Sequence, residues 1–365
     1  MIKIPKTMNA FVLMRHGGME ALEFRTDWAV PEIGPDEVLI KVGACGLNNT
    51  DVNTRSGWYS KAVTDRTTGD AFDKIGKEDP SWGGAPITFP RIQGADAVGT
   101  VVAVGENADA AVLGKRVMVD TWLRDWNNPY NRHKTGYFGS ECDGGFAQYT
   151  KTHHKNIGVV DSPLSDAELA TFACSYTTAE GMLNRANVGV GDHVLVAGAS
   201  GGVGSALLQL AKRRDATVIA LASEAKHADV SKFKPDVILS RTPNDLAGEL
   251  KAKTGRETVD VVADIVGGPY FDTLINVLDR GGRYTCSGAI AGPIVKLDLR
   301  TFYLRDLTFT GSTVVPPHVF GDLVSYIEAG EVKPALAATF ALADLPKAQQ
   351  AFIDKKHTGN IVVIP

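Results

Sequence analysis

Apolar residues change their spacing sharply within residues 192–212, which read DHVLVAGASGGVGSALLQLAK. A short, continuous apolar run over 193–197 is typical of a buried strand. Beyond a glycine-rich turn, apolar side chains recur at i, i+3, i+4, i+7 and i+8, namely at Val203, Ala206, Leu207, Leu210 and Ala211. That spacing gives a helix one buried face. The segment therefore predicts a strand, a tight turn and a helix in direct succession.

The glycines of this turn lie where a dinucleotide-binding motif requires them. In the pattern G-x-G-x-x-G, the second glycine lets the backbone approach a pyrophosphate, and the third lets the helix pack closely on the strand. Gly201 and Gly204 hold these two positions, whereas Ala199 replaces the first glycine. The helix N-terminus adds free N–H groups and the positive end of its dipole. We therefore interpret the turn as a cofactor site formed by Ala199, Ser200, Gly201, Gly202, Val203 and Gly204.

The end of the next predicted strand, 216–222, bears on the choice between NAD and NADP. NAD sites place an acidic residue there to bind the ribose 2′-hydroxyl. Here the strand is followed by Ser223, with Lys226 nearby and Arg241 after a later strand. A hydroxyl and two cations suit a 2′-phosphate, whereas Glu224 keeps NAD as an alternative. The pattern favours NADP.

The first 160 residues carry the spacing of β-structure. Residues 37–44 alternate between two faces, and further apolar runs at 98–104 and 115–120 are separated by Gly, Asn and Asp turns. Many short strands of this kind predict a barrel- or sandwich-like unit.

From residue 165 the pattern changes to alternating helices and strands. A helical pattern over 166–186 precedes the glycine-rich turn, and apolar runs follow it at 217–222, 237–240, 260–265 and 282–287. This alternation predicts a parallel, doubly wound sheet, and hence an α/β fold. The tail, which we expect to return to the first unit, predicts a strand at 307–311, helices at 318–329 and 346–355, and a last strand at 360–364.

Composition and charge exclude several classes of protein. The 365 residues are 44% hydrophobic and 22% charged, as in an ordinary globular protein of two domains, and the net charge of −4 gives no reason to expect nucleic acid. No apolar run approaches the ~20 residues of a membrane span. The N-terminus lacks the pattern of a secretion signal, and the four cysteines are scattered singly, without a disulfide or zinc-cluster pattern. We expect a cytoplasmic protein that acts on a small-molecule substrate.

Motifs along nearly the whole chain resemble those of the medium-chain dehydrogenase/reductase superfamily, which contains zinc alcohol dehydrogenases and zinc-free quinone oxidoreductases. The resemblance rests on GACGLNNTD (43–51), RSGWY (55–59), GADAVGTVVAVG (94–105), DGGFAQY (143–149), VLVAGASGGVG (194–204), LDRGGRY (278–284) and HTGNIVV (357–363). It implies a GroES-like β-barrel catalytic domain over 1–160, completed by 307–365, and a Rossmann domain over 161–306. It also implies a homodimer.

The zinc ligands of the alcohol dehydrogenases are absent from the matching motifs. A catalytic zinc needs three protein ligands of Cys, His or carboxylate type. The corresponding positions hold Asn48, Ala95 and Cys174, and Asp96 does not restore the set. The stretch that matches the structural zinc lobe, 120–143, contains a single cysteine. We therefore expect no bound metal.

Without a Lewis acid, an activated alkene or a quinone suits the site better than a simple ketone or alcohol. Resemblance to the zinc-free reductases and the 2-enoyl thioester reductases implies Asn48 as an orienting amide and Tyr59 as acid or oxyanion donor. Asp51 and Thr178 are the other candidate catalytic residues. Gly288, Ala289 and Ser312 follow later strands, where they could contact the nicotinamide.

Alternatives remain for function and for single residues. The protein could reduce enoyl thioesters, or could bind NADPH without catalysis. Asn48 and Asp51 could only cap a turn and a helix, and Tyr59 could only pack at the rim. His153 and His154 are interpreted as a surface pair rather than a metal site. The tryptophans expected beside the cleft are Trp58, Trp82, Trp122 and Trp126.

Overall fold

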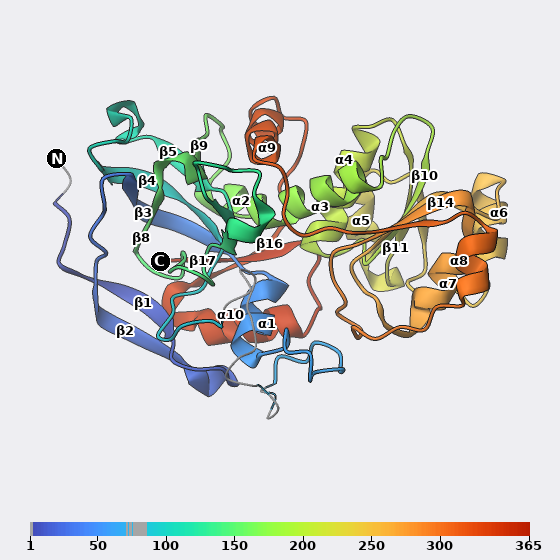
Figure 1. The fold of residues 1–365 in the computed structure, drawn as a ribbon, viewed down its shortest axis with the longest axis horizontal. Helices are drawn as coiled ribbons and strands as arrows, with labels where there is room; N and C mark the ends of the chain where they lie inside the picture. Colours follow the sequence, from blue (N-terminus) through green and yellow to red (C-terminus); the bar gives the residue numbers. More distant parts are fainter. Residues whose placement is uncertain (1–2, 71, 73–74, 76–85) are drawn as a thin grey trace.

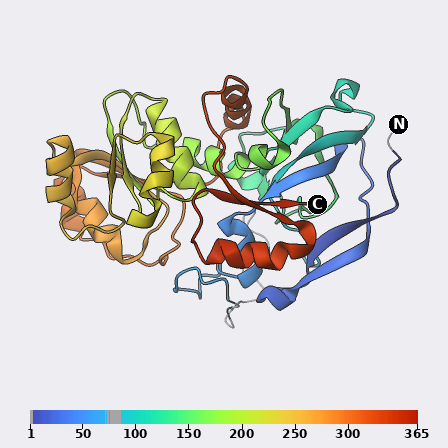
Figure 2. The same ribbon diagram turned by 180° about the vertical axis from the view of Figure 1, so that it is seen from behind.

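The computed structural model describes residues 3–70, 72, 75 and 86–365, which form two units lying side by side (Figures 1 and 2). One unit contains the first 160 residues and the C-terminal segment. The other contains the central residues, so that both chain ends lie in the first unit.

The central residues form a six-stranded sheet in which all neighbouring strands are parallel, as predicted. In spatial order the strands are β12 (Val237–Leu239), β11 (Thr217–Leu221), β10 (His193–Ala197), β13 (Val259–Asp264), β14 (Leu278–Cys286) and β15 (Thr308–Gly311). This is the 3-2-1-4-5-6 order of a dinucleotide-binding sheet.

Both faces of this sheet are covered, which explains why its strands read as continuous apolar runs. Val194 and Val196 of β10 pack in one core with α3 (Ala173–Arg185) and α4 (Gly202–Lys212). Leu195 and Ala197 point the other way, into a second core. The helices of this second face are α6 (Leu246–Thr254), α7 (Phe271–Asn276) and α8 (Leu299–Leu304). A short helix, α5 (His227–Val230), adds Val230 to the first core.

The carboxyl ends of the six strands lie in one row. The strand pairing matches Ala197 with Leu221, and Leu221 with Leu239. On the other side it matches Ala197 with Asp264, Asp264 with Cys286, and Cys286 with Gly311. Residues that follow these strands therefore meet along a single sheet edge, where α/β proteins bind their ligands.

The first unit is built on a seven-stranded sheet of mostly antiparallel strands. Its members are β3 (Glu37–Gly46), β4 (Asp96–Val104), β5 (Arg116–Val119), β8 (Tyr149–His153), β9 (Ile157–Val159), β16 (Leu336–Ala341) and β17 (Asn360–Ile364). The predicted strands at 37–44, 98–104 and 115–120 are confirmed.

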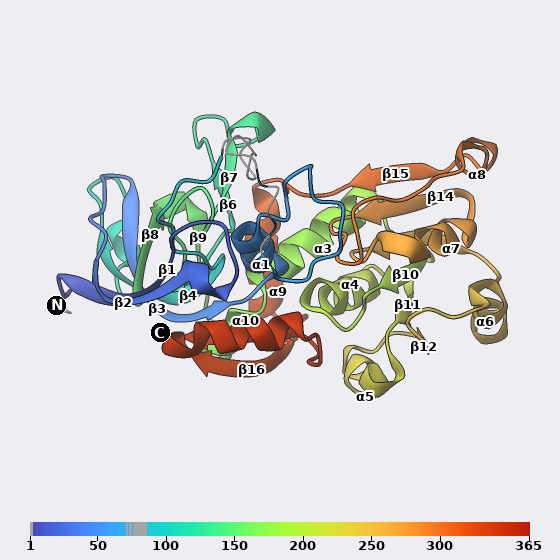
Figure 3. The same ribbon diagram turned by 90° about the horizontal axis from the view of Figure 1, so that it is seen from below.

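Smaller elements complete this unit. The helices are α1 (Asn49–Ser56), α2 (Asp166–Leu169) and α10 (Leu345–Ile353), and Figure 3 shows α10 beside β16. Two antiparallel pairs are formed by β1 (Thr7–Leu13) with β2 (Leu22–Ala29), and by β6 (Trp122–Arg124) with β7 (Thr135–Tyr137).

The tail returns to the first unit later than the sequence predicts. The prediction assigned 307–365 to the first domain, but β15 hydrogen-bonds to β14 within the parallel sheet. Only β16 and β17 enter the seven-stranded sheet, and β16 was not predicted. Between them and β15, α9 (His318–Glu328) packs on α3. The predicted helix over 166–186 is divided into α2 and α3.

No helix among the described residues is both long and apolar enough to cross a membrane.

Candidate active site

The glycine-rich turn between β10 and α4 has the predicted geometry. Gly198 takes a φ of 75°, a conformation that L side chains disfavour. A Cβ at Gly204 would lie 2.1 Å from the carbonyl oxygen of Gly198, so the helix packs against the turn with no room for a side chain. A Cβ at Gly201 would meet only that same oxygen, at 3.7 Å. The space before Gly201 is therefore open, at the positive end of α4.

Buried polar atoms near the strand ends fit a ligand with phosphate and amide groups. Asn360 Oδ1 and Ser312 Oγ are buried and lack a hydrogen-bond partner. Asn360 Oδ1 lies 2.6 Å from the point where Gly202 would carry a Cβ. Gly288 and Ala289 follow β14, and Ser312 follows β15, at the same sheet edge. The open turn and the unpaired polar atoms together fit a dinucleotide lying along this edge.

The two cations predicted to bind a 2′-phosphate differ in their surroundings. Arg241 is exposed and lies just beyond β12. The hydroxyl residue of the predicted site, Ser223, is half-buried and lies just beyond β11. The pKa of Lys226 is lowered, first by burial and then by the charge of Arg241, so the two cations are neighbours. However, Lys226 Nζ donates to the carbonyl oxygens of Lys355 at 2.7 Å and His357 at 2.6 Å. Lys226 therefore also holds the C-terminal segment against the nucleotide-binding unit.

A buried hydrogen-bond network joins Asn48, Asp51 and Asp96. Asp51 accepts the backbone N–H of Asn48 at 2.8 Å and that of Gly94 at 3.2 Å, which fixes the start of α1. Asn48 Nδ2 donates to Asp96 Oδ2 at 2.8 Å, and the other oxygen of Asp96 accepts the backbone N–H of Cys174 at 2.6 Å. Asp51 therefore caps the start of α1, which was the alternative interpretation of this residue. Asp96 links α1 to the first turn of α3.

Burial raises the pKa of both carboxyl groups in this network. The pKa of Asp96 is raised to about 7 by burial, against the opposing effect of the two hydrogen bonds that it accepts. The pKa of Asp51 is raised to about 7, again mainly by burial, and the charge of Asp96 adds to the effect. Near neutral pH the two groups therefore hold protons for part of the time, which lowers the charge of the site.

The positions of the zinc ligands lie in and beside a buried apolar cluster, at the place where the family resemblance implies the substrate pocket. Ala95, Trp122, Tyr137, Cys174 and Val315 belong to one buried cluster. The Tyr137 hydroxyl donates to Cys174 Sγ at 3.0 Å, and the Trp122 ring packs edge-on against Tyr137, with 5.2 Å between ring centres. Burial raises the pKa of the Cys174 thiol far above neutrality, so Cys174 is a neutral, small side chain at this position.

The other predicted catalytic residues lie close to this pocket. Burial raises the pKa of Tyr59 against the opposing effect of a hydrogen bond with the Asn53 side chain, so Tyr59 keeps its proton; Cys174 and Asp51 lie near enough to influence this pKa. Thr178 follows Cys174 by one helical turn on α3, close enough to lower the pKa of its thiol against the larger effect of burial. Thr177 instead donates to the Ala173 carbonyl at 2.7 Å within its own helix. The structure thus brings Asn48, Asp51, Tyr59 and Thr178 to one place.

The described part of the 60–90 loop connects the two units. The backbone N–H of Thr67 donates to the carbonyl of Ile290 at 3.0 Å, next to Ala289. Trp58 Nε1 donates to the Asp65 carbonyl at 2.9 Å within the same loop. Trp82 lies outside the described residues. Trp126 packs beside His153, with 6.0 Å between ring centres, rather than beside Cys174.

Two family models match the chain. Residues 34–163 match the alcohol dehydrogenase GroES-like domain, and residues 202–329 match the zinc-binding dehydrogenases. A solved structure from Sinorhizobium meliloti 1021, described as an alcohol dehydrogenase, is 44% identical. It superposes with a TM-score of 0.90 over 99% of this chain and 98% of its own.

Curated relatives span the same length. Quinone oxidoreductase of Homo sapiens is 25% identical, over 98% of each chain. The chloroplastic NADPH-dependent alkenal/one oxidoreductase of Arabidopsis thaliana is 28% identical, over 99% of this chain and 81% of its own. The chain belongs to the medium-chain dehydrogenase/reductase superfamily, in its quinone-oxidoreductase-like branch.

As a member of this superfamily the chain is an oxidoreductase with a nicotinamide cofactor, and the GroES-like and Rossmann-type units are confirmed. One of its family models is named for zinc, yet the three ligand positions hold an amide, a methyl group and one thiol. Among the described residues, those of this pocket form no group of three candidate metal ligands.

Sequence reasoning missed two features of this dehydrogenase site. Tyr137 lies within residues 120–143, and its contact with Cys174 leaves no signal in the sequence. Lys355 is half-buried beside Lys226, and its Nζ donates to Asn49 Oδ1 at 2.9 Å. Burial and the charge of Lys226 lower the pKa of Lys355 to about 7. The one signal in the sequence was the basic run Lys355-Lys356-His357, whose histidine is the first residue of the terminal HTGNIVV motif.

Two glycine substitutions separate packing from cofactor binding. Gly204→Ala places a Cβ against the Gly198 carbonyl and is expected to lower the free energy of unfolding by about 1–3 kcal/mol. Gly201→Ala has room and is expected to change stability by less than about 0.5 kcal/mol. It should weaken NADPH binding roughly tenfold or more, because the new methyl group occupies the open space. Urea unfolding and fluorescence titration measure the two effects; equal NADPH affinity in Gly201→Ala and the parent protein would contradict the assignment.

The raised pKa of Asp96 predicts that stability falls as the pH rises. Between about pH 4 and pH 7 the folded protein keeps a proton that the unfolded chain has released, so the free energy of unfolding decreases across this window. In Asp96→Asn this group no longer titrates, and Asn48 can turn its amide to present its oxygen. From pH 5 to pH 8 the variant should lose about 1–3 kcal/mol less than the parent protein in urea unfolding. Exposed Asp306→Asn serves as the control, and parallel pH profiles for all three proteins would refute the expectation.

Proposed function

We propose that this dehydrogenase is a zinc-independent, NADP(H)-dependent reductase of quinones or α,β-unsaturated carbonyl compounds. The observation that carries the proposal is the occupation of the zinc-ligand positions. Asn48 is hydrogen-bonded to Asp96, and Ala95 has no ligand atom. Cys174 is a neutral thiol that accepts a hydrogen bond from the Tyr137 hydroxyl. A metal ion would find one sulfur ligand where three ligands are needed.

NADPH, when bound, supplies a hydride to the β-carbon of the acceptor. Negative charge then develops on the carbonyl oxygen, and the α-carbon needs a proton. Tyr59 is suited to the first demand, because burial raises the pKa of its phenol and keeps the group protonated as a hydrogen-bond donor to the oxygen. The same raised pKa makes the phenol a weaker acid, so delivery of the proton to the α-carbon is the part of its role that a substitution must test. Asn48 and Asp51 act as positioning residues, since their hydrogen bonds fix the start of α1, which precedes Tyr59. Thr178 lies beside the Cys174 thiol, one helical turn along α3.

The pocket favours an uncharged acceptor. Trp122, Tyr137, Val315 and Ala95 form a buried apolar cluster with Cys174, and the nearby carboxyl groups of Asp51 and Asp96 are partly protonated near neutral pH. A flat quinone or an enone loses little hydration in such a place, whereas a charged group would lose much.

NADP rather than NAD is favoured by Ser223 and by the positive charges of Arg241 and Lys226 beyond β11 and β12. Glu224, the acid that kept NAD open, is exposed at the first position of a short 3-10 turn. Lys226 has two hydrogen bonds to carbonyl oxygens, which leaves its third N–H for a phosphate.

A substrate panel tests the proposal. NADPH and NADH oxidation is measured with quinones, enones, enoyl-CoA thioesters and simple aldehydes, each with and without a chelator. We expect turnover of quinones or enones with NADPH and rates unaffected by the chelator. Preferred turnover of enoyl-CoA would identify the thioester reductase instead, and NADPH binding without any turnover would identify a binding protein. Activity lost to the chelator and restored by Zn²⁺ would refute zinc independence.

Tyr59→Phe tests the proton donor. The substitution keeps the ring but removes the hydroxyl, and kcat should fall by about 10²-fold while NADPH affinity is unchanged. Tyr130→Phe, at an exposed tyrosine, is the matched control. Activity of Tyr59→Phe equal to that of Tyr130→Phe would exclude the hydroxyl from the reaction.

We further propose a homodimer formed through the edge of the parallel sheet. Exposed apolar side chains are concentrated between β14 and β15, the last strand of the sheet: Ile294, Val295, Leu299, Tyr303 and Leu304. Burying such a patch drives association. Light scattering should give twice the chain mass of 38.9 kDa, and Leu299→Glu should give the monomer. Leu113→Glu, at an exposed leucine of the other unit, should remain dimeric. A monomeric parent protein would disprove the dimer.

A further inference from the structure

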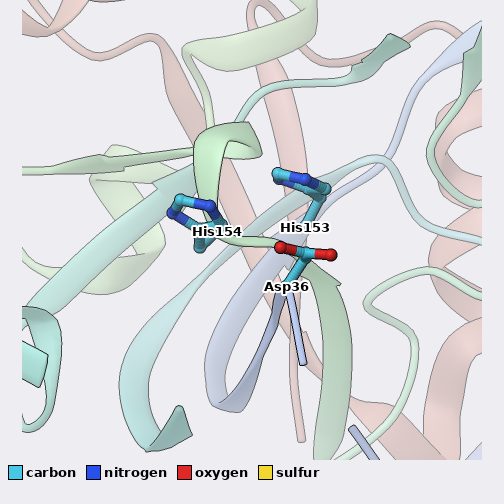
Figure 4. A group of neighbouring side chains, drawn as sticks. All are labelled: Asp36, His153 and His154. Carbon is cyan, nitrogen blue, oxygen red and sulfur yellow. The ribbon is translucent and has the colours of Figure 1, made fainter. Parts of the chain in front are cut away.

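Two histidines and an aspartate converge at the end of the seven-stranded sheet that lies away from α1. Asp36 directly precedes β3, His153 ends β8, and His154 begins a 3-10 turn (Figure 4). His153 is paired with Glu37 across the two strands, and the backbone N–H of His154 donates to the Asp36 carbonyl at 2.8 Å. The sheet therefore fixes the three backbones relative to one another.

The side chains offer nitrogen and oxygen ligands to one point. One ligand atom from each residue lies within 4.8 Å of the other two. The two imidazole rings are stacked, with 4.7 Å between centres and 21° between planes. Within the described parts of the chain this is the one group of three candidate ligands that is so close. All three residues are half-buried, so an ion could keep a water molecule.

A neighbouring group orients one of the three side chains. Asn107 Nδ2 donates to Asp36 Oδ1 at 3.0 Å, which orients the carboxylate and leaves its second oxygen available, as outer partners of metal ligands do.

Metal binding by His153 requires the loss of one hydrogen bond that its ring now accepts. His153 Nδ1 accepts the backbone N–H of Lys155 at 3.1 Å, so that in the neutral ring the proton sits on Nε2. Ligation through Nδ1 replaces this hydrogen bond with a metal bond. No backbone change is needed, because the ring can turn at the half-buried end of its strand.

We propose that Asp36, His153 and His154 form a binding site for a divalent first-row transition ion such as Zn²⁺. Two imidazoles and a carboxylate are a ligand set for Zn²⁺, with water as the fourth ligand. Bonds of about 2.0–2.1 Å to a tetrahedral ion require the ligand atoms to approach to roughly 3.4 Å, which side-chain rotation supplies. Mg²⁺ and Ca²⁺, which prefer oxygen ligands, are excluded by the imidazoles.

The site would be structural and not catalytic. The ten residues of β3 separate Asp36 from the end that leads to Asn48, roughly 30 Å along the strand. An ion there joins the start of β3 to the end of β8 and stabilises the sheet. A preparation of the protein could then contain stoichiometric zinc although its turnover needs none.

Calorimetric titration of metal-free, untagged protein with Zn²⁺ tests the site. We expect one ion per chain with a Kd of about 10 µM or below, and a higher Tm in its presence. His154→Ala and Asp36→Asn should each weaken binding at least roughly tenfold and abolish the Tm increase. His133→Ala, at an exposed histidine of another loop, should bind as the parent protein does. The Tm of each variant without metal shows that it is folded.

A second readout comes from Trp126, whose ring lies 6.0 Å from that of His153. Cu²⁺ bound at the site should quench part of the tryptophan fluorescence, and Trp126→Phe should remove that part. Absence of Zn²⁺ binding below about 100 µM, or equal binding by His154→Ala and the parent protein, overturns the proposal. NADPH-dependent turnover by His154→Ala is expected to equal that of the parent protein, so this test and that of the proposed function can fail independently.

Discussion

The carboxylate of Asp96 joins the two units at the point where the chemistry is expected. One oxygen accepts Asn48 Nδ2 at the start of α1, and the other accepts the Cys174 N–H in the first turn of α3. A free N–H at a helix N-terminus is satisfied well by a carboxylate, which also meets the positive end of the helix dipole. Because α1 belongs to the first unit and α3 to the second, the placement of substrate-side residues against the nucleotide-binding sheet depends on this contact.

The same contact orders the side chains of Asn48 and Cys174, two of the three positions that match zinc ligands. In the zinc members of the superfamily metal bonds would hold the side chains at these three positions. Here a hydrogen-bond network from Asp51 through Asn48 and Asp96 to Cys174 does so. Its partly protonated carboxyl groups add little charge, and the clustered apolar side chains around Cys174 exclude water. A preorganised pocket of low charge is suited to stabilise charge that appears only during a reaction.

Local patterns predicted the elements, because strands and helices depend on spacing that the chain shows directly. The strand–turn–helix at 193–212, the parallel sheet and the tail helices were confirmed within a few residues. The partner of β15 was not predictable from its apolar run, since pairing with β14 depends on the whole sheet. For the same reason the contacts of Lys226 with Lys355 and His357, over 120 residues away, left no local signal. Tyr137 was missed because its role depends on Cys174, a distant partner.

A further contact between the units lies beside the nucleotide turn. The Gly359 N–H donates to the Ser200 carbonyl at 2.8 Å, and Asn360 Nδ2 donates to Ser175 Oγ at 3.1 Å. The segment that begins β17 is therefore attached both to the glycine-rich turn and to α3. With Asp96 at the other attachment of α3, the cofactor edge and the substrate pocket are held in one arrangement before either ligand binds. Orientation achieved in advance reduces the entropy that must be lost when hydride donor and acceptor meet.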